Sequence, residues 1–107
     1  SLSFDQTKSE LKESAMAELD LVAQWMMRDP AVRIRFIGHT DNQGDPLRNV
    51  KLSEDRVRNV KKYLVDKGIG SNRIETVGYG GAFPIADNST EESRKLNRRV
   101  EMEILDK

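Results

Sequence analysis

Apolar side chains recur with helical spacing in the first quarter of the chain. They repeat every three or four residues until Asp29-Pro30 ends the pattern, at Leu11, Ala15, Leu19, Val22 and Met26. Thr7 and Glu10 have the spacing of a capping box, in which a threonine caps a helix and a glutamate three residues on bonds back to it. The pattern therefore predicts a long amphipathic helix that follows Thr7.

A second helical pattern lies in the middle of the chain. Ser53 is a good N-cap residue, and Gly68 suits the left-handed conformation that often follows a helix. The spacing predicts a helix from Ser53 to about Lys67, with a buried stripe of three residues, Val57, Val60 and Leu64.

Shorter apolar runs predict strands. Residues 32–38 alternate apolar and polar at their start, 73–80 end in glycines, and 99–104 alternate with Val100, Met102 and Ile104 on one face. Leu2 to Phe4 resemble the end of a first strand. A short helix is expected to end near Asn97, capped by Asn88 or Ser89. Four strands with two long helices and a short one indicate an α+β domain, a two-layer sandwich.

Composition limits the function classes. At 107 residues the chain is expected to form one domain, 1–107, and because it begins at Ser1 without methionine we expect it to come from a longer protein. The 18 basic and 18 acidic residues cancel, so no global field favours nucleic acid. The chain has no cysteine and one histidine, and no apolar run approaches the roughly 20 residues of a membrane span. We expect no metal, no cofactor and no nucleic-acid partner.

Two charged residues carry the main functional hypothesis. Asp41 lies in a cluster of turn formers just after a predicted strand, and Arg56 lies in the first turn of the predicted second helix. A cation there opposes the helix dipole, which makes its position informative. With helix N–H groups beside it, Arg56 could bind a carboxylate while Asp41 accepts from an ammonium group, so that the two would hold a zwitterion. The alternative, favoured by spacing alone, is that Asp41 and Arg56 pair with each other.

Other candidate groups are weaker. His39 and Asp41 could form a base with an orienting carboxylate, but no nucleophile can be placed beside them. A basic helix surface, Arg58, Lys61 and Lys62, could contact a partner, although a solvated helix face is the commoner arrangement.

Four segments in order along the chain resemble one known family. They are Phe4-Asp5 before Lys8-Ser9, Gly38-His39-Thr40-Asp41-Asn42 with Gly44, Leu52-Ser53 with Arg56-Val57, and Asn97-Arg98-Arg99-Val100-Glu101. This ordered set resembles the OmpA-like peptidoglycan-binding domain and covers nearly the whole chain. The resemblance implies a mixed sheet backed by helices, and binding of the peptidoglycan stem peptide without catalysis.

The resemblance also implies roles for individual residues. Asp41 and Arg56 match the family's aspartate and arginine, which hold the ammonium and carboxylate of meso-diaminopimelate. Thr40, Asn42 and Leu52 would flank the pocket, and Arg98 would support Asp41 or the ligand. The backbone of three further residues would line the pocket, Asp5, Gln6 and Thr7.

The expected function is therefore that of a non-enzymatic module that tethers an envelope protein to the cell wall. Its location would be the periplasmic face of the envelope, attached to the outer membrane through an upstream segment outside this chain, and a homodimer is kept as a candidate assembly. Two alternatives stay open. One is a protein-interaction domain of the envelope that uses the basic helix surface, and the other is an enzyme on wall peptides with His39 and Asp41 as acid and base.

Overall fold

A four-stranded sheet forms one layer of the fold in the computed structural model, which describes residues 2–4 and 8–107. The strands β1 (Leu2–Ser3), β2 (Arg33–His39), β3 (Ile74–Gly78) and β4 (Arg99–Asp106) lie in the order β1-β4-β2-β3. Strand β2 pairs with β3 in parallel and with β4 antiparallel, and β1 pairs antiparallel with β4. The sheet is therefore mixed, as the resemblance implied.

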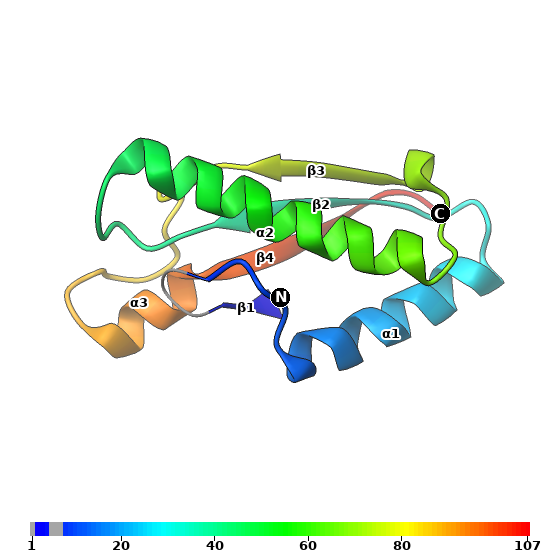
Figure 1. Ribbon diagram of the computed structural model, residues 1–107, viewed down its shortest axis with the longest axis horizontal. Helices are drawn as coiled ribbons and strands as arrows, with labels where there is room; N and C mark the ends of the chain where they lie inside the picture. Colours follow the sequence, from blue (N-terminus) through cyan, green and yellow to red (C-terminus); the bar gives the residue numbers. More distant parts are fainter. Residues whose placement is uncertain (1, 5–7) are drawn as a thin grey trace.

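Helices form the second layer. Figure 1 shows α1 (Glu13–Arg28) and α2 (Pro46–Asp66) on one face of the sheet. The short helix α3 (Glu91–Asn97) lies at the end of the sheet where the loops after β2 and β3 gather, and a 3-10 turn, Ser71–Arg73, precedes β3. The predicted α+β two-layer sandwich with two long helices and a short one is confirmed. Among the described residues, no helix has both the length and the apolar character needed to cross a membrane.

The core lies between the two layers and contains the predicted helix stripes. Val57, Val60 and Leu64 of α2 are buried, as are Ala15, Leu19 and Met26 of α1. From the sheet, Ile34, Phe36, Ile74 and Val100 complete this cluster, together with Leu2 and Phe4. Burial of each of the larger apolar side chains stabilises the fold by about 1.5–3 kcal/mol, and together they hold the helices on the sheet.

Met102 does not join this core, although alternation along the last strand predicted it there. Its side chain is 45% exposed. Strand β1 pairs only with Arg99 and Val100, so the edge of β4 beyond these two residues has no neighbouring strand in the described part of the chain. Alternation identified the face of the strand correctly, but it could not show where the covering strand ends.

The other face of the sheet carries a ladder of charges. Arg33 and Arg35 of β2 both pair with Glu75 of β3, and on the opposite side they pair with Asp106 and Glu103 of β4. Such cross-strand pairs suit a sheet face in contact with water.

Helix α1 begins later than the capping box predicted. Its first residue is Glu13, after Lys12 as N-cap, and the capping residue Thr7 lies outside the described residues. The carbonyl oxygens that a longer helix would use are bonded elsewhere, because Lys8 O accepts from Arg56 and Ser9 O accepts from Asn59. Side chains of α2 therefore hold this segment in a non-helical path.

Helix α2 begins earlier than predicted, and this correction matters for the site. Asp45 is its N-cap, with a side chain that accepts from Arg48 N, and Pro46 occupies the first turn. Ser53 is buried in the middle of the helix, so Arg56 is far from the helix N-terminus, and the argument from the helix dipole was wrong. The sequence pattern placed the start at Ser53, but proline is favoured at the first helical position after a cap such as Asp45.

The cap of α3 also differs from the prediction. Thr90 is the N-cap, and its hydroxyl accepts from Ser93 N. The expected caps are engaged in the preceding loop, where Ser89 N donates to Asp87 and Asn88 Oδ1 accepts from Asn97.

Candidate functional site

Asp41 lies in the loop that follows β2, two residues after His39. Figure 1 shows that the loops after β2 and β3 and helix α3 gather at this end of the sheet. Its side chain is 2% exposed. One carboxylate oxygen, Oδ2, accepts from Arg98 Nη1 at 3.0 Å, and the other, Oδ1, accepts from the backbone N–H of Gln43 at 3.0 Å. The carboxylate is therefore fixed on both sides.

Arg98 holds Asp41 in place while it is itself held by two other groups. Its Nη1 and Nη2 donate to the two carboxylate oxygens of Glu91 at 3.1 and 3.0 Å, and its Nε donates to Phe4 O at 3.2 Å. The hydrogen bonds to Glu91, and then the one to Asp41, raise the pKa of Arg98 against the opposing effect of burial. The hydrogen bond from Arg98 likewise lowers the pKa of Glu91. The sequence pointed to Arg98 as a support, but it gave no sign of Glu91.

Arg56 is fully buried on α2, close to the same end of the sheet. Its Nε donates to Lys8 O at 2.9 Å and its Nη1 to His39 O at 3.2 Å. The ring of Phe4 lies over the guanidinium at 5.0 Å. Phe4 thus contacts Arg56 through its ring and Arg98 through its carbonyl, so one residue adjoins both arginines.

Asp41 and Arg56 do not pair with each other, so the alternative of a direct ion pair was wrong. Among the described residues, the ion pair of Asp41 is the one with Arg98. The structure therefore brings Asp41, Arg56 and Arg98 to one end of the fold, with the two members of the hypothesised zwitterion site held by different partners.

The flanking residues expected from the family pattern are placed as follows. Thr40 is buried and donates its hydroxyl to Asp41 O at 2.7 Å, Asn42 is exposed, and Leu52 is half-buried on α2, one turn before Arg56. The expected pocket residues Asp5, Gln6 and Thr7 lie outside the described residues.

His39 does not face Asp41. Its ring is buried against Tyr79 and Phe83, with Nε2 at 3.4 Å from Glu101 and neither ring nitrogen hydrogen-bonded within the described part of the chain. Burial, and then the charge of Arg99, lowers the pKa of His39. The described residues therefore contain no His39–Asp41 acid–base pair.

The basic surface of α2 is largely engaged within the molecule. Arg58 pairs with Asp55 and Lys62 pairs with Asp66, while Lys61 donates to Ile74 O at the edge of β3. Among the described residues, no group of three acidic or histidine side chains could hold a metal ion.

Asn49 and Ser53 are supporting residues that the sequence reasoning missed. The Asn49 side-chain amide donates to Gln43 O at 3.0 Å and to Asp41 O at 3.5 Å. These bonds hold the loop between β2 and α2 against the first turns of α2. Ser53 Oγ accepts from Gly80 N at 2.9 Å and so holds the loop after β3. Both share a helix face with Arg56. Once α2 is known to begin at Pro46, the helical spacing of Asn49, Ser53 and Arg56 places three polar side chains on one face, and this pattern would indicate supporting residues.

Close packing at this end requires glycine at Gly78. A Cβ there would lie 2.6 Å from both Glu54 N and Ser53 Oγ. Such a contact would force α2 away from β3 and so displace Ser53 from the loop that it anchors.

Known proteins resemble this chain over most of its length. The model of the OmpA family matches residues 3–98. The chain belongs to the OmpA family. Outer membrane protein A of Bordetella avium is 49% identical over 102 residues, which are 95% of this chain and 53% of that protein. The peptidoglycan-binding protein ArfA of Mycobacterium bovis is 42% identical over 86 residues, which are 80% of this chain and 26% of that protein.

A solved structure shows the same fold. The peptidoglycan-associated lipoprotein of Burkholderia pseudomallei superposes with a TM-score of 0.92 at 28% identity, and the match covers 96% of this chain and 87% of that one. The chain spans about half or less of the length of the first curated relatives that it matches, with 31%, 29% and 53% covered. The OmpA-family fold is therefore shared over almost the whole chain, within relatives that are longer.

Proposed function

We propose that this OmpA-family domain binds peptidoglycan non-covalently, through the meso-diaminopimelate side chain of the stem peptide. The observation that carries the proposal is the placement of Asp41 and Arg56, a carboxylate and a guanidinium, at one end of the fold and held by separate partners. The names of two matched proteins, one peptidoglycan-binding and one peptidoglycan-associated, support the choice of ligand.

The chemistry of diaminopimelate suits these two groups. The end of its side chain carries an ammonium and a carboxylate on one carbon, so Asp41 would accept from the ammonium and Arg56 would donate to the carboxylate. A charge-assisted hydrogen bond contributes about 1.5–3 kcal/mol, and more where water is excluded. Arg98 would position Asp41, while Thr40, Asn42 and Leu52 flank the ligand together with the backbone of Asp5 and Thr7.

Access to the site requires movement. Asp41 and Arg56 are 2% and 0% exposed, and the ring of Phe4 lies over Arg56. A ligand must therefore displace Phe4 or a neighbouring group before it reaches the guanidinium. Part of the binding energy would be spent on this opening, which lowers the apparent affinity for a single stem peptide. A wall with many stem peptides would restore retention through multivalency.

The proposed role of the whole protein is to anchor part of the envelope to the wall. We propose that residues 1–107 act as one non-enzymatic domain of a longer protein on the periplasmic face of the envelope, joined to the outer membrane by another segment. The curated relatives named as outer membrane proteins, of which this chain covers only a part, support this location. The homodimer stays a prediction, which light scattering of the domain would check.

Titration calorimetry tests the proposal. The ligands are a stem peptide with diaminopimelate and the matched peptide with lysine, which lacks the distal carboxylate. We expect binding of the first to be at least tenfold tighter, and Asp41→Asn and Arg56→Gln each to weaken it at least tenfold. Arg58→Gln, on the same helix but with a side chain 70% exposed, is the matched control and should bind like wild type. Equal affinity for both peptides, or unchanged binding by both folded variants, would disprove the proposal.

A further inference from the structure

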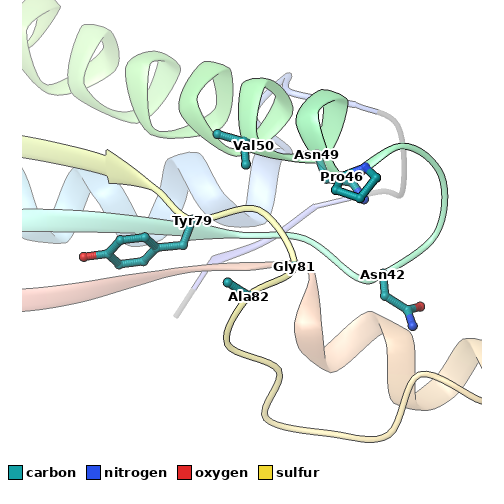
Figure 2. Close-up of a pocket in the computed structure, with 7 residues that line it drawn as sticks. All are labelled: Asn42, Pro46, Asn49, Val50, Tyr79, Gly81 and Ala82. Atoms are coloured by element: carbon teal, nitrogen blue, oxygen red, sulfur yellow. The ribbon is translucent and has the colours of Figure 1, made fainter.

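Glu91 connects the short helix α3 to the candidate site through Arg98. Its carboxylate oxygens accept from Arg98 Nη1 at 3.1 Å and from Nη2 at 3.0 Å, and the same Nη1 donates to Asp41 Oδ2 at 3.0 Å. One guanidinium therefore lies between two carboxylates, of which that of Asp41 is buried and that of Glu91 is exposed. Figure 2 shows the loop at Asn42, the residue after Asp41, next to the pale orange helix α3. Glu91 is thus one side chain removed from the carboxylate that would bind the ligand ammonium.

The charges around Asp41 cancel only when Glu91 is included. Arg98 alone offsets the charge of Asp41, and Arg94 adds a second cation, with its Nε 3.5 Å from Glu91 Oε1. The two carboxylates and the two guanidinium groups cancel, whereas without Glu91 one positive charge would be in excess. Lys95, which also lies on α3, acts on Glu91 as a further cation. An excess of positive charge beside Asp41 would repel an incoming ammonium group.

Glu91 also orients the guanidinium that holds Asp41. A carboxylate that accepts from both Nη atoms of an arginine fixes the plane of the fork as well as its position. The Nε of Arg98 donates to Phe4 O at 3.2 Å, so all three nitrogens of the side chain are engaged. Hydrogen bonds from Arg98 lower the pKa of Glu91, and its carboxylate therefore stays ionised near neutral pH.

We propose that Glu91 is a positioning residue for cation binding, which offsets the charge of Arg98 so that Asp41 can hold the ammonium group of the ligand. The inference rests on the proposed function and adds to it a residue that does not touch the ligand. Glu91 would raise the affinity for ligands that carry the distal ammonium. It would not strengthen the contact between Arg56 and the distal carboxylate.

Nuclear magnetic resonance titration with three stem tripeptides tests this role. The side chain of the third residue ends in both charged groups in diaminopimelate, in the ammonium alone in lysine, and in the carboxylate alone in α-aminopimelate. Glu91→Gln removes the charge but keeps one oxygen that can accept from Arg98. We expect it to weaken binding of the first two ligands about fivefold and not to weaken binding of the third, since an exposed charge acts through solvent and is partly screened. Glu92→Gln, at the neighbouring exposed position in the first turn of α3, is the matched control and should bind all three ligands like wild type.

Two further readouts separate charge from packing. Glu91→Asp keeps the negative charge and should bind the diaminopimelate peptide more tightly than Glu91→Gln does. The difference in affinity between wild type and Glu91→Gln should shrink to about twofold when the salt concentration rises from about 0.05 M to about 0.5 M, because salt screens a charge effect. The Glu91 side chain is 53% exposed, so both variants should fold, which circular dichroism would confirm.

The outcomes separate this inference from the proposed function. If Glu91→Gln bound the diaminopimelate peptide like wild type, the inference would be overturned and the diaminopimelate site would stand. The same holds if Glu91→Gln weakened all three ligands by one factor at both salt concentrations, since Glu91 would then only brace the fold. Failure of wild type to bind any of the three ligands would refute the proposed function and this inference with it.

Discussion

Removal of the Arg98 guanidinium should strongly destabilise the fold. In Arg98→Met the Asp41 carboxylate, 2% exposed, would lose the cation at 3.0 Å and stay buried with the Gln43 N–H as its remaining protein donor among the described residues. Loss of one member of a buried ion pair typically costs 3–5 kcal/mol, because the other charge is left unpaired. The same substitution also removes the hydrogen bond to Phe4 O and the two bonds to Glu91.

The expected cost is large relative to the total stability. A domain of this size has about 5–15 kcal/mol of unfolding free energy, so a loss of this size should lower the urea midpoint strongly. At roughly 4 °C or more per kcal/mol, its melting temperature should fall by about 12 °C or more. Urea and thermal unfolding followed by circular dichroism measure both quantities.

Two further variants show whether the buried pair is the cause. Arg58→Met removes an arginine of α2 that makes a 2.8 Å pair with Asp55 at an exposed position, and it should cost less than about 1 kcal/mol. In the double variant Asp41→Asn with Arg98→Met no buried charge is left unpaired, so it should lose less stability than the two single variants added together. If Arg98→Met were no more destabilising than Arg58→Met, or if the double variant showed simple additivity, the reasoning would be refuted.

Three other changes test separate parts of the structure by urea unfolding. Gly38→Ala would place a Cβ 2.6 Å from Ser53 O, so we expect about 2–3 kcal/mol of destabilisation, and an unchanged midpoint would contradict the close packing of α2 on β2. Asp45→Ala removes the N-cap of α2 and should cost about 1 kcal/mol, whereas no loss would mean that the cap is unimportant. Burial lowers the pKa of His39, so the unfolded chain binds its proton first as the pH falls below about 6.5, and stability should decrease there. His39→Leu should flatten this dependence between pH 7.5 and 5.5, and equal slopes in both proteins would contradict it.

The sequence predicted those features that depend on local periodicity. The stripe of Val57, Val60 and Leu64 follows from helical spacing, and it is buried as expected. The start of α2 was also encoded locally, because Asp45-Pro46 is a typical cap with proline in the first turn. It was missed because the same residues are common in turns, and the error placed Arg56 at a helix terminus.

The network around the candidate site could not be predicted in this way. Arg98 reaches Phe4 and Asp41 across most of the length of the chain, and Arg56 bonds to the carbonyl oxygens of Lys8 and His39. These partners depend on the sheet order, which brings the ends of β1, β2 and β4 together. Spacing along the chain carries no information on which distant carbonyl a buried arginine will find.

The Asp41 carboxylate is fixed without being saturated, and this bears on how it could bind a cation. Arg98 and the Gln43 N–H occupy two positions of a group that can accept about four hydrogen bonds. A ligand ammonium that reached Asp41 would therefore find an acceptor already oriented, and it would add to the existing pair instead of breaking it. The cost of binding would then fall mainly on the groups that cover Arg56, among them Phe4, which adjoins both arginines. A ligand that carries only the ammonium would offset the free energy of this opening with one charge-assisted contact, to Asp41. A zwitterion would offset it with two, to Asp41 and to Arg56. Selectivity for diaminopimelate over lysine would thus arise from the opening step as well as from the contact to Arg56.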